Sequence, residues 1–308
     1  MKTSQRQARR HGYIVIDKPA GATSHDVVAA VRRIVGERRV GHAGTLDPAA
    51  VGVLPIAVGL ATRTVEYLAD ASKGYRAGIT FGIETDSADG DGRVLVMRDP
   101  VHLREAAVRE LLSRFLGDSM QRPPALSAIK VGGRRLYDLA RQGTPVNPEA
   151  RPVSFHRLGV LDWTSPVLTV DIECSKGTYI RSLARDLGIA AGTGAYLSHL
   201  VRTRSGPFTL HDAVALAVLP DAIAARGWSE LAFHPDWALL DRDSVVLSPE
   251  HVARWRTGLD VPIVGRVPGP VRVYDDSGCW IGVGQAEPEC GSTRPRKVVS
   301  ISMEHSEP

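Results

Sequence analysis

Short strand patterns interrupted by isolated helices constrain the fold of this chain more than any other feature. Runs rich in β-branched and aromatic residues predict strands at 13–16, 54–58, 75–81, 153–161 and 167–174. Apolar residues at helical spacing predict helices at 24–35, 103–116 and 179–187. Because strands and helices do not alternate strictly, we expect an α+β fold with a mixed, mostly antiparallel sheet and flanking helices.

Residue patterns also predict details of these elements. Ser24 is expected to cap the first helix and Gly36 to end it. In the third strand, alternate residues from Tyr75 to Phe81 are expected on one face. The apolar stripe of the second helix is expected to consist of Leu103, Ala107, Leu111, Leu112 and Phe115.

From about Asp241 onward the sequence changes in character. A short helix at 249–257 is followed by small strands at 271–274 and 280–283, which glycine and proline turns separate. This pattern indicates a compact β-barrel-like module. The 308 residues, 43% of them hydrophobic, can form one large domain, predicted at 12–240, and this small one at 241–303. The alternative is an extension that only packs on the main domain.

The sequence lacks the features of a membrane, secreted or metal-binding protein. No apolar run approaches the roughly 20 residues that span a bilayer, and the N-terminus has no signal-peptide stretch. We therefore expect a cytoplasmic protein. The three cysteines, Cys174, Cys279 and Cys290, stand far apart without zinc-site spacing, so we expect neither disulfides nor a metal site.

Two basic segments stand out against a net charge of only +4. The first is the tail at 1–11, whose composition predicts disorder and, compatibly, weak attraction to RNA. The second runs from Gln121 to Arg151 and is either a solvated helix face or an element that grips phosphates. Its basic residues are Arg122, Lys130, Arg134, Arg135, Arg141 and Arg151, against Asp138 and Glu149.

The segment Gly41–Pro48 is too irregular for ordinary core, because it combines two glycines, a histidine and an aspartate. It lies between a predicted helix and a predicted strand, and loops held by rigid elements often carry catalytic groups. Asp47 is the only carboxylate between Glu37 and Glu66. It is either a catalytic residue or part of a turn beside Pro48.

This loop belongs to a series of motifs along the chain. The others are Asp17–Ser24, Gly52–Ile56, Gly74–Arg76, Arg122–Pro124 with Ser127–Lys130, Lys176–Arg181 and Leu200–Thr203. In order and spacing, the series resembles the signature of the tRNA pseudouridine-55 synthases, the TruB family. Departures are mild, such as Ser87 and Ala88 in the turn Thr85–Gly90, and none falls on a residue with an assigned chemical role.

The resemblance implies a fold and an activity. The fold is that of the pseudouridine synthases with a PUA-type RNA-binding domain, assigned by position to 241–303. The activity is isomerisation of the uridine at position 55 of the tRNA T-loop, which breaks the bond from C1′ to N1 and joins C1′ to C5. Because this reaction involves no redox change, we expect no cofactor. The expected partner is the T-arm stem-loop of tRNA. We expect the protein to be a monomer and not to bind a membrane.

The same resemblance implies roles for individual residues. Asp47 is the carboxylate that acts at the sugar, either as a nucleophile at C1′ or as a base that removes the 2′ proton. Arg181 is its partner and should keep it ionised against the effect of burial. Tyr75 offers a stacking surface to the flipped base, and its hydroxyl can help to remove the C5 proton. The further substrate-binding residues are His42, which takes the place of the flipped base, Tyr179 and Leu200, which wall the uracil pocket, and Lys130.

Three other functions fit parts of the sequence. A noncatalytic RNA-binding protein would account for the basic segments, but not for Asp47, Tyr75 and Arg181 at motif positions. An aspartate-nucleophile hydrolase would ordinarily need Mg²⁺, yet no second aspartate stands two residues from Asp47 and no P-loop motif occurs. A pseudouridine synthase with another RNA substrate is the closest alternative, and the segments Gly41–Pro48 and Pro123–Pro124 argue against it.

Overall fold

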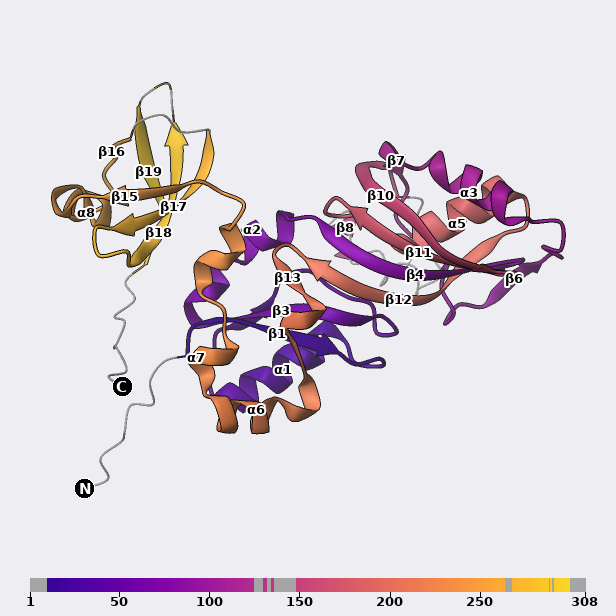
Figure 1. The fold of residues 1–308 in the computed structure, drawn as a ribbon, viewed down its shortest axis with the longest axis horizontal. Coiled ribbons are helices and arrows are strands. Elements are labelled where there is room, and N and C mark those ends of the chain that lie inside the picture. The colour runs from indigo at the N-terminus through magenta and orange to yellow at the C-terminus, as the bar shows by residue number, and fades with distance from the viewer. Residues whose placement is uncertain are drawn as a thin grey trace.

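Figure 1 shows the fold in a computed structural model of the chain. The structure describes residues 10–124, 130–131, 134–135, 148–263, 268–287, 289 and 291–299, and at 130–131 and 134–135 only the backbone. Most of the tail predicted at 1–11 therefore lies outside the described residues. Its last two residues contact the domain: Arg10 Nη1 donates to the Val35 carbonyl at 3.3 Å, and the His11 carbonyl accepts from Trp228 Nε1 at 3.0 Å.

A mixed ten-stranded sheet organises the main domain. Its path is β14 (Ala213–Ala215), β1 (Gly12–Lys18), β3 (Val51–Val58), β12 (Ala195–Ser205), β4 (Lys73–Phe81), β11 (Val167–Cys174), β10 (Arg151–Thr164) and β7 (Gly117–Gln121), with β2 (Val40–His42) on β3 and β13 (Phe208–Thr209) on β12. Within the described chain, β1 pairs with β14 and β3 with β12 in parallel, whereas the other pairs of this sheet are antiparallel. The predicted α+β class with a mostly antiparallel sheet is confirmed.

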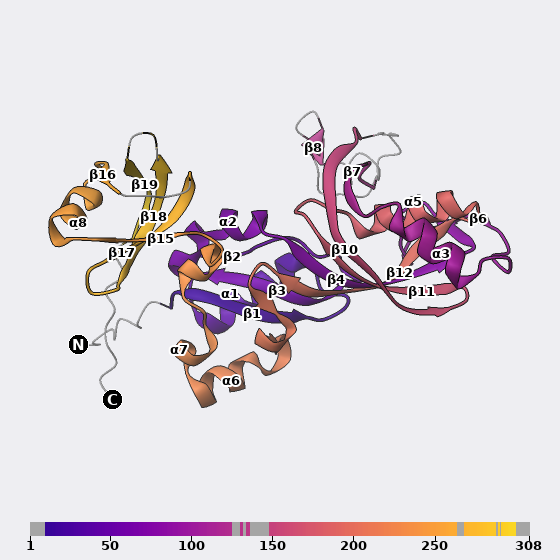
Figure 2. The ribbon, with the colours of Figure 1, turned by 45° about the horizontal axis from the view of Figure 1, so that its top comes forward.

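Two groups of helices cover the sheet at its two ends (Figures 1 and 2). Helices α1 (Ser24–Val35), α6 (Leu219–Arg226) and α7 (Trp228–Leu231) lie against β1 and β3, and their shared core includes Ile14, Val31 and Leu54. Helices α3 (Glu105–Ser113) and α5 (Ile180–Ala191) pack against β4, β10 and β11. Shorter elements are η1 (Gly59–Arg63), α2 (Val65–Asp70), and the hairpins of β5 (Ile83–Thr85) with β6 (Val94–Met97) and β8 (Lys130–Val131) with β9 (Arg134–Arg135).

The predicted face of β4 is confirmed, since Ala77, Ile79 and Phe81 are fully buried and Tyr75 packs against the same core. Gly36 ends α1 as predicted. The predicted cap of α1 is wrong. Thr23 caps the helix, because its Oγ1 accepts from the Asp26 N–H at 3.1 Å while the Asp26 carboxylate accepts from the Thr23 N–H at 2.9 Å.

The predicted apolar stripe of α3 is also partly wrong. The helix begins only at Glu105, so Leu103 is buried ahead of it. Val108 and Leu112 form its buried face, whereas Ala107 is exposed. Leu111 and Phe115 pack against the core as predicted, so only Ala107 is wrong. Alanine carries too little apolar surface to determine which side of a helix faces the core.

A curled five-stranded sheet forms the C-terminal module, as predicted. Its order is β15 (Ser244–Leu247), β17 (Gly269–Asp275), β18 (Trp280–Glu287), β19 (Ser292–Val298) and β16 (Val261–Pro262), with α8 (Pro249–Arg256) beside it. The module has its own core around Trp255. A second core joins it to the main domain, where Trp280 and Val299 pack in one cluster with Tyr13 and Phe208. Among the described residues, no helix has the length and apolar character to cross a membrane.

Helix α5 approaches β12 so closely that position 188 has no room for a side chain. A Cβ atom on Gly188 would lie 2.1 Å from the nitrogen of Ala195 and 2.4 Å from the carbonyl carbon of Gly194. At an open helical position, replacing glycine with alanine stabilises a protein by about 1 kcal/mol. We expect the clash to reverse this sign, so that Gly188→Ala lowers the free energy of unfolding by about 1–3 kcal/mol in urea denaturation.

The exposed Ala190 on the same helix provides the control. Ala190→Gly measures the propensity difference alone and should cost about 1 kcal/mol. A Gly188→Ala variant as stable as the unmodified protein would contradict the close packing of α5.

Candidate active site

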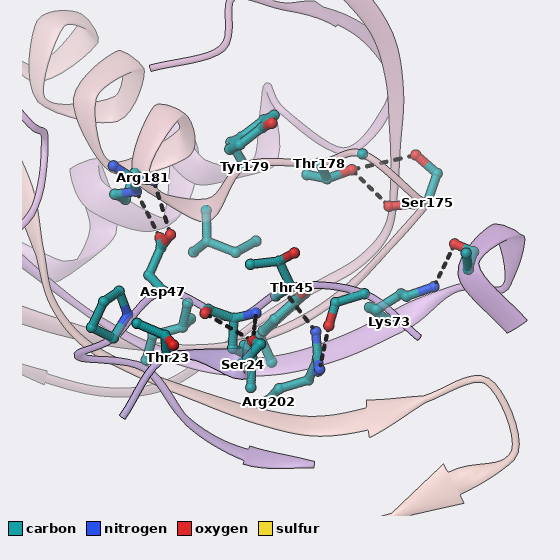
Figure 3. Close-up of a pocket in the computed structure, with 18 of the residues that line it drawn as sticks. Thr23, Ser24, Thr45, Asp47, Lys73, Ser175, Thr178, Tyr179, Arg181 and Arg202 are labelled. Atoms are coloured by element: carbon teal, nitrogen blue, oxygen red, sulfur yellow. Dashed lines mark hydrogen bonds and ion pairs between the residues drawn. The ribbon is translucent and has the colours of Figure 1, made fainter. Parts of the chain in front are cut away.

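A cavity of about 720 Å³ lies where the N-terminus of α1, the loop after β2, the start of β4 and the segment before α5 meet. Figure 3 shows its lining side chains. The lining includes Thr23–His25, residues 44–48, Lys73, Tyr75, Ser175, residues 177–181, Leu200 and Arg202. The cavity is of the size that holds small ligands in proteins.

Four hydrogen bonds hold the loop that carries Asp47. Ser24 Oγ accepts from the Leu46 N–H at 2.9 Å and lies 3.2 Å from the Leu46 carbonyl, to which it donates. The buried amine of Lys18 donates to the Pro48 carbonyl at 3.0 Å. The same carbonyl accepts from the Gly21 N–H at 2.9 Å. The backbone on both sides of Asp47 is therefore held before any substrate arrives, which is the arrangement a catalytic group needs.

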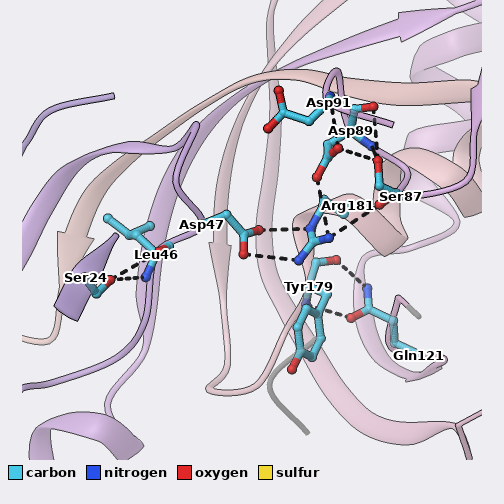
Figure 4. Close-up of polar contacts among 9 residues, drawn as sticks. All are labelled: Ser24, Leu46, Asp47, Ser87, Asp89, Asp91, Gln121, Tyr179 and Arg181. Carbon is cyan, nitrogen blue, oxygen red and sulfur yellow. Dashed lines mark hydrogen bonds and ion pairs between the residues drawn. The ribbon is translucent and has the colours of Figure 1, made fainter. Parts of the chain in front are cut away.

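Asp47 and Arg181 form a two-pronged ion pair across the cavity (Figure 4). Arg181 Nη2 lies 3.1 Å from Asp47 Oδ1, and Arg181 Nε lies 2.9 Å from Asp47 Oδ2. The side chain of Arg181 is only 7% exposed, whereas that of Asp47 is 43% exposed. The arginine thus forms part of the wall and the carboxylate faces the open cavity.

The environment of Asp47 changes its acidity. Burial raises its pKa above the ordinary aspartate value, and the neighbouring Asp89 acts in the same direction. The charge of Arg181 opposes both effects and stabilises the ionised form. The net direction is upward, so the carboxylate is more basic than an ordinary one. The expectation that Arg181 supports the ionised form agrees with its contribution, although burial outweighs it.

The turn between β5 and β6 holds the other side of Arg181 (Figure 4). Arg181 Nη1 lies 3.5 Å from Asp89 Oδ2 and 3.5 Å from the Ser87 carbonyl. Sequence reasoning gave Asp89 no role, although it lies in the turn Thr85–Gly90 that belongs to the motif pattern. The position of Asp89 within this motif could have marked it as a site residue. Its contact with Arg181 could not be read from the sequence.

Tyr75 lines the cavity from β4 and lies next to Arg202 on β12. Burial raises the pKa of the Tyr75 hydroxyl, and a hydrogen bond from Arg202 opposes this effect. Arg202 is itself 1% exposed. It donates from Nε to the Val53 carbonyl at 2.7 Å, and from its other nitrogens to the carbonyls of Thr45 at 3.3 Å and Gly44 at 3.2 Å. Arg202 therefore connects the aromatic wall to the loop that carries Asp47, a role that sequence reasoning missed.

A second buried amine lies at the far end of the cavity. Lys73 is 6% exposed and donates to the carbonyls of Leu68 at 3.1 Å and Ala69 at 2.8 Å. Burial, assisted by the charge of Arg202, lowers the pKa of Lys73 to about 8. In the described chain, neither Lys18, Lys73 nor Arg202 forms an ion pair with a carboxylate.

The structure brings five of the predicted site residues to this cavity: Asp47, Tyr75, Tyr179, Arg181 and Leu200. Tyr179 is positioned through its backbone, whose N–H donates to Gln121 Oε1 at 2.8 Å and whose carbonyl accepts from Gln121 Nε2 at 3.1 Å. Leu200 comes from β12 beside Arg202.

The other two predicted residues are placed differently. His42 does not line the cavity, but its ring makes an edge contact with that of His25, 5.5 Å away, which does. Burial lowers the pKa of His42, so its ring is neutral at physiological pH. The side chain of Lys130 lies outside the described residues, and so do those of Arg134, Arg135 and Arg141. Among the residues the structure describes, no group of three or more His, Cys, Asp or Glu side chains has metal-binding geometry.

Family models cover most of the chain. A model described as "TruB family pseudouridylate synthase (N terminal domain)" matches residues 32–180. Two more, described as "tRNA pseudouridylate synthase B C-terminal domain" and "Pseudouridine synthase II TruB, C-terminal", match residues 181–242 and 244–299.

Curated proteins and solved structures are similar over nearly the same extent. tRNA pseudouridine synthase B of Symbiobacterium thermophilum is 50% identical over 246 residues, which are 79% of this chain and 80% of that protein. The protein of the same name from a Synechococcus species is 44% identical over 94% of this chain and 98% of its own. The crystal structure of a Cbf5-Nop10-Gar1 complex contains a chain with a TM-score of 0.74 and 27% identity, covering 94% of this chain and 84% of that one.

The ion pair predicts how the acidity of Asp47 responds to substitution. Arg181→Met removes the charge that opposes burial, so the pKa of Asp47 should rise further, and Arg181→Lys should give an intermediate value because it keeps the charge without the planar fork. Carbon-13 NMR titration of the Asp47 carboxyl measures each value. Arg185→Met is the control, since Arg185 on the same helix pairs with Asp186 instead. A pKa that stays unchanged in Arg181→Met would show that the two residues are not coupled.

Proposed function

This chain belongs to the TruB family of pseudouridine synthases, and we propose that it isomerises the uridine at position 55 in the T-loop of tRNA. Relatives named tRNA pseudouridine synthase B at 44–50% identity establish an RNA pseudouridine synthase that acts on tRNA. The choice of the T-loop is supported by the motif residues of Gly41–Pro48 and Pro123–Pro124, which resemble those of the pseudouridine-55 enzymes. A different uridine in RNA is the alternative.

The proposal rests on the position of the Asp47 carboxylate. It faces a cavity of about 720 Å³ and forms a two-pronged ion pair with Arg181. The reaction requires a carboxylate near the sugar, held in one orientation and in its ionised form. A two-pronged guanidinium contact provides orientation and charge together. Tyr75 on β4 lines the same cavity and provides the aromatic surface on which the base can stack.

Two routes are compatible with this geometry. In the first, an Asp47 oxygen attacks C1′ while the C1′–N1 bond breaks and its electron pair leaves on the uracil. In the second, Asp47 removes the 2′ proton as the same bond breaks, and later returns it. In both routes the uracil then turns and C5 bonds to C1′. In the first route this step also breaks the bond between C1′ and the Asp47 oxygen, whose electron pair returns to the carboxylate. The C5 proton leaves, N1 is protonated, and Asp47 ends as a carboxylate, so the product is an isomer and no co-reactant is consumed.

Base flipping is part of the proposal, because a stacked base in a folded T-loop cannot reach a cavity wall. Leaving the stack costs a few kcal/mol. Contact with an aromatic ring returns about 1–3 kcal/mol per base, which makes Tyr75 the natural replacement for the lost stacking. Tyr179 and Leu200 would then close the uracil pocket. His42, beside His25 at its rim, would occupy the place of the flipped base.

The remaining parts of the chain are proposed to bind RNA. We assign catalysis to residues 12–240, phosphate contacts to the basic segment 121–151 with Lys130, and accessory binding to the module at 241–303. The partner is the T-arm of a tRNA, which a single copy of the chain binds in the cytoplasm.

The first test of this function concerns Asp47 itself. Asp47→Asn is nearly isosteric but cannot act as a nucleophile or base, so single-turnover formation of pseudouridine should fall at least about 1000-fold. Affinity for RNA should change less than about threefold, since the replaced group acts on bond breaking. Release of tritium from C5-labelled uridine in a T-arm stem-loop measures the rate, with the exposed Asp221→Asn as control.

Two results would overturn parts of the proposal. An Asp47→Asn variant that keeps more than a few percent of the rate would remove Asp47 from the chemistry. Equal tritium release from an unrelated stem-loop would leave the enzyme class intact and reject the T-loop as its target.

Tyr75 allows stacking to be separated from proton transfer. Tyr75→Phe keeps the ring but loses the hydroxyl that Arg202 contacts, so RNA affinity should persist while the tritium-release step slows. Tyr75→Leu loses both and should weaken RNA binding by about 5- to 150-fold, the equivalent of one lost stacking contact. Filter binding and single-turnover assays of both variants provide the comparison. Behaviour like that of the unmodified protein in both variants would exclude Tyr75 from the site.

A further inference from the structure

A second cavity of about 350 Å³ lies between α2 of the main domain and the sheet of the C-terminal module. Its wall on the main domain consists of Glu66, Tyr67 and Asp70. Its wall on the module consists of Pro270, Gln285, Arg296 and Lys297. We call it the interdomain cleft. It plays no part in the site described above.

A β-bulge directs two consecutive basic side chains into this cleft. Along β18 and β19, Val283 pairs with Lys297 and the adjacent Gly284 pairs with Pro295, so Arg296 is an extra residue in its strand. In a regular strand neighbouring side chains point to opposite faces. The bulge breaks this alternation, and both Arg296 and Lys297 line the cleft. Bulges that re-aim side chains in this way are frequent beside functional sites.

The charges of the cleft favour an anion. Its two carboxylates are already paired, Glu66 with Lys297 at 2.9 Å and Asp70 with Lys176 at 2.8 Å. Arg296 is exposed, and within the described chain no ion pair or hydrogen bond engages its side chain. The guanidinium of Arg296 lies close enough to Tyr67 to lower the pKa of its hydroxyl, although burial, the larger effect, raises it. The cleft therefore contains one uncompensated cation beside an aromatic ring.

The cleft also contains a group that can recognise a base. The side-chain amide of Gln285 is half-buried in its wall and has no hydrogen-bond partner in the part of the chain that the structure describes. An amide offers both a donor and an acceptor, the combination that base edges present. Together the three side chains can contact all parts of a nucleotide. Arg296 can contact the phosphate, Tyr67 the face of the base and Gln285 its edge.

Helix α2 connects this cleft to the catalytic cavity. Ala69 lines the catalytic cavity, while its neighbour Asp70 lines the cleft. The partner of Asp70, Lys176, immediately precedes Gly177 and Thr178, which also line the catalytic cavity. The two cavities are therefore lined by neighbouring residues of one short helix. Helix α2 has six residues and is about 9 Å long. Figure 2 shows α2 beside the C-terminal module. We therefore expect RNA that leaves the catalytic cavity on this side to reach the cleft.

We propose that the interdomain cleft binds one unpaired nucleotide of the same tRNA, outside the T-loop. The base stacks on Tyr67 and is contacted at its edge by Gln285, and its phosphate lies against Arg296. This inference rests on the proposed tRNA substrate. A free mononucleotide carries the same base and phosphate groups as a nucleotide of tRNA. The experiment therefore distinguishes tRNA from a free mononucleotide as the ligand of the cleft.

The test measures how a variant altered only in the cleft binds two RNAs, full-length tRNA and an isolated T-arm stem-loop. In Gln285→Leu/Arg296→Met both side chains keep their approximate size but lose the amide and the charge. We expect the Kd for full-length tRNA to rise about tenfold and the salt dependence of log Kd to decrease by roughly one unit. The Kd for an isolated T-arm stem-loop, and its turnover, should stay unchanged. Arg294→Met is the matched control, because Arg294 on the same strand pairs with Asp260.

The possible outcomes are distinct. Unchanged affinity for full-length tRNA would overturn the inference, as would an equal loss for both RNAs, which would place the contact within the T-arm. A third arm titrates uridine monophosphate against the side-chain NMR signal of Gln285. Displacement of the mononucleotide by full-length tRNA supports the inference, whereas mononucleotide binding that tRNA does not displace rejects it. Failure of the stem-loop to react with the unmodified protein would concern the proposed function and not the cleft.

Discussion

The two-pronged contact between Asp47 and Arg181 is the interaction on which the rest of the site depends. The two residues lie 134 positions apart in the chain, one on the loop after β2 and one at the start of α5. Their contact joins the two helix-covered halves of the sheet. Breaking it would leave the guanidinium of Arg181, which is 7% exposed, with Asp89 as the carboxylate partner described above, at the longer distance of 3.5 Å. Removing one partner of a buried charge is costly. The sheet, the packing of α5 and the loop contacts all serve to bring these two groups together.

Much of the fold could be predicted because the strands follow clear periodic patterns, as in the alternation from Tyr75 to Phe81. The cap of α1 was predicted wrongly because two neighbouring residues are equally suitable for that position. Thr23 and Ser24 are both good caps, and the choice is made by the tertiary contact of Ser24 with Leu46, which no local pattern contains. Such choices depend on partners that are remote in sequence.

The site could be predicted to the extent that its residues stand in motifs. Asp47 and Arg181 were found by this signal, and the structure places them in contact. Lys18, Asp89 and Arg202 were not assigned roles, although all three stand in or beside motif segments. Their function is to hold backbone carbonyls or another side chain, and a sequence does not reveal which carbonyl a buried cation will meet. The C-terminal module also shares a core with the main domain, through Trp280 and Val299, that its strand pattern did not indicate.

The buried cations Lys18, Lys73 and Arg202 have a consequence for the protein without RNA. Carbonyl oxygens accept hydrogen bonds from these cations but carry no net charge, so the hydrogen bonds do not neutralise the positive charges. Burial is the main cause of the lowered pKa of Lys73, and the charge of Arg202 lowers it further. A polyanion that settles over the cavity supplies the missing negative charge. We therefore expect part of the affinity for RNA to come from relief of the repulsion among these cations.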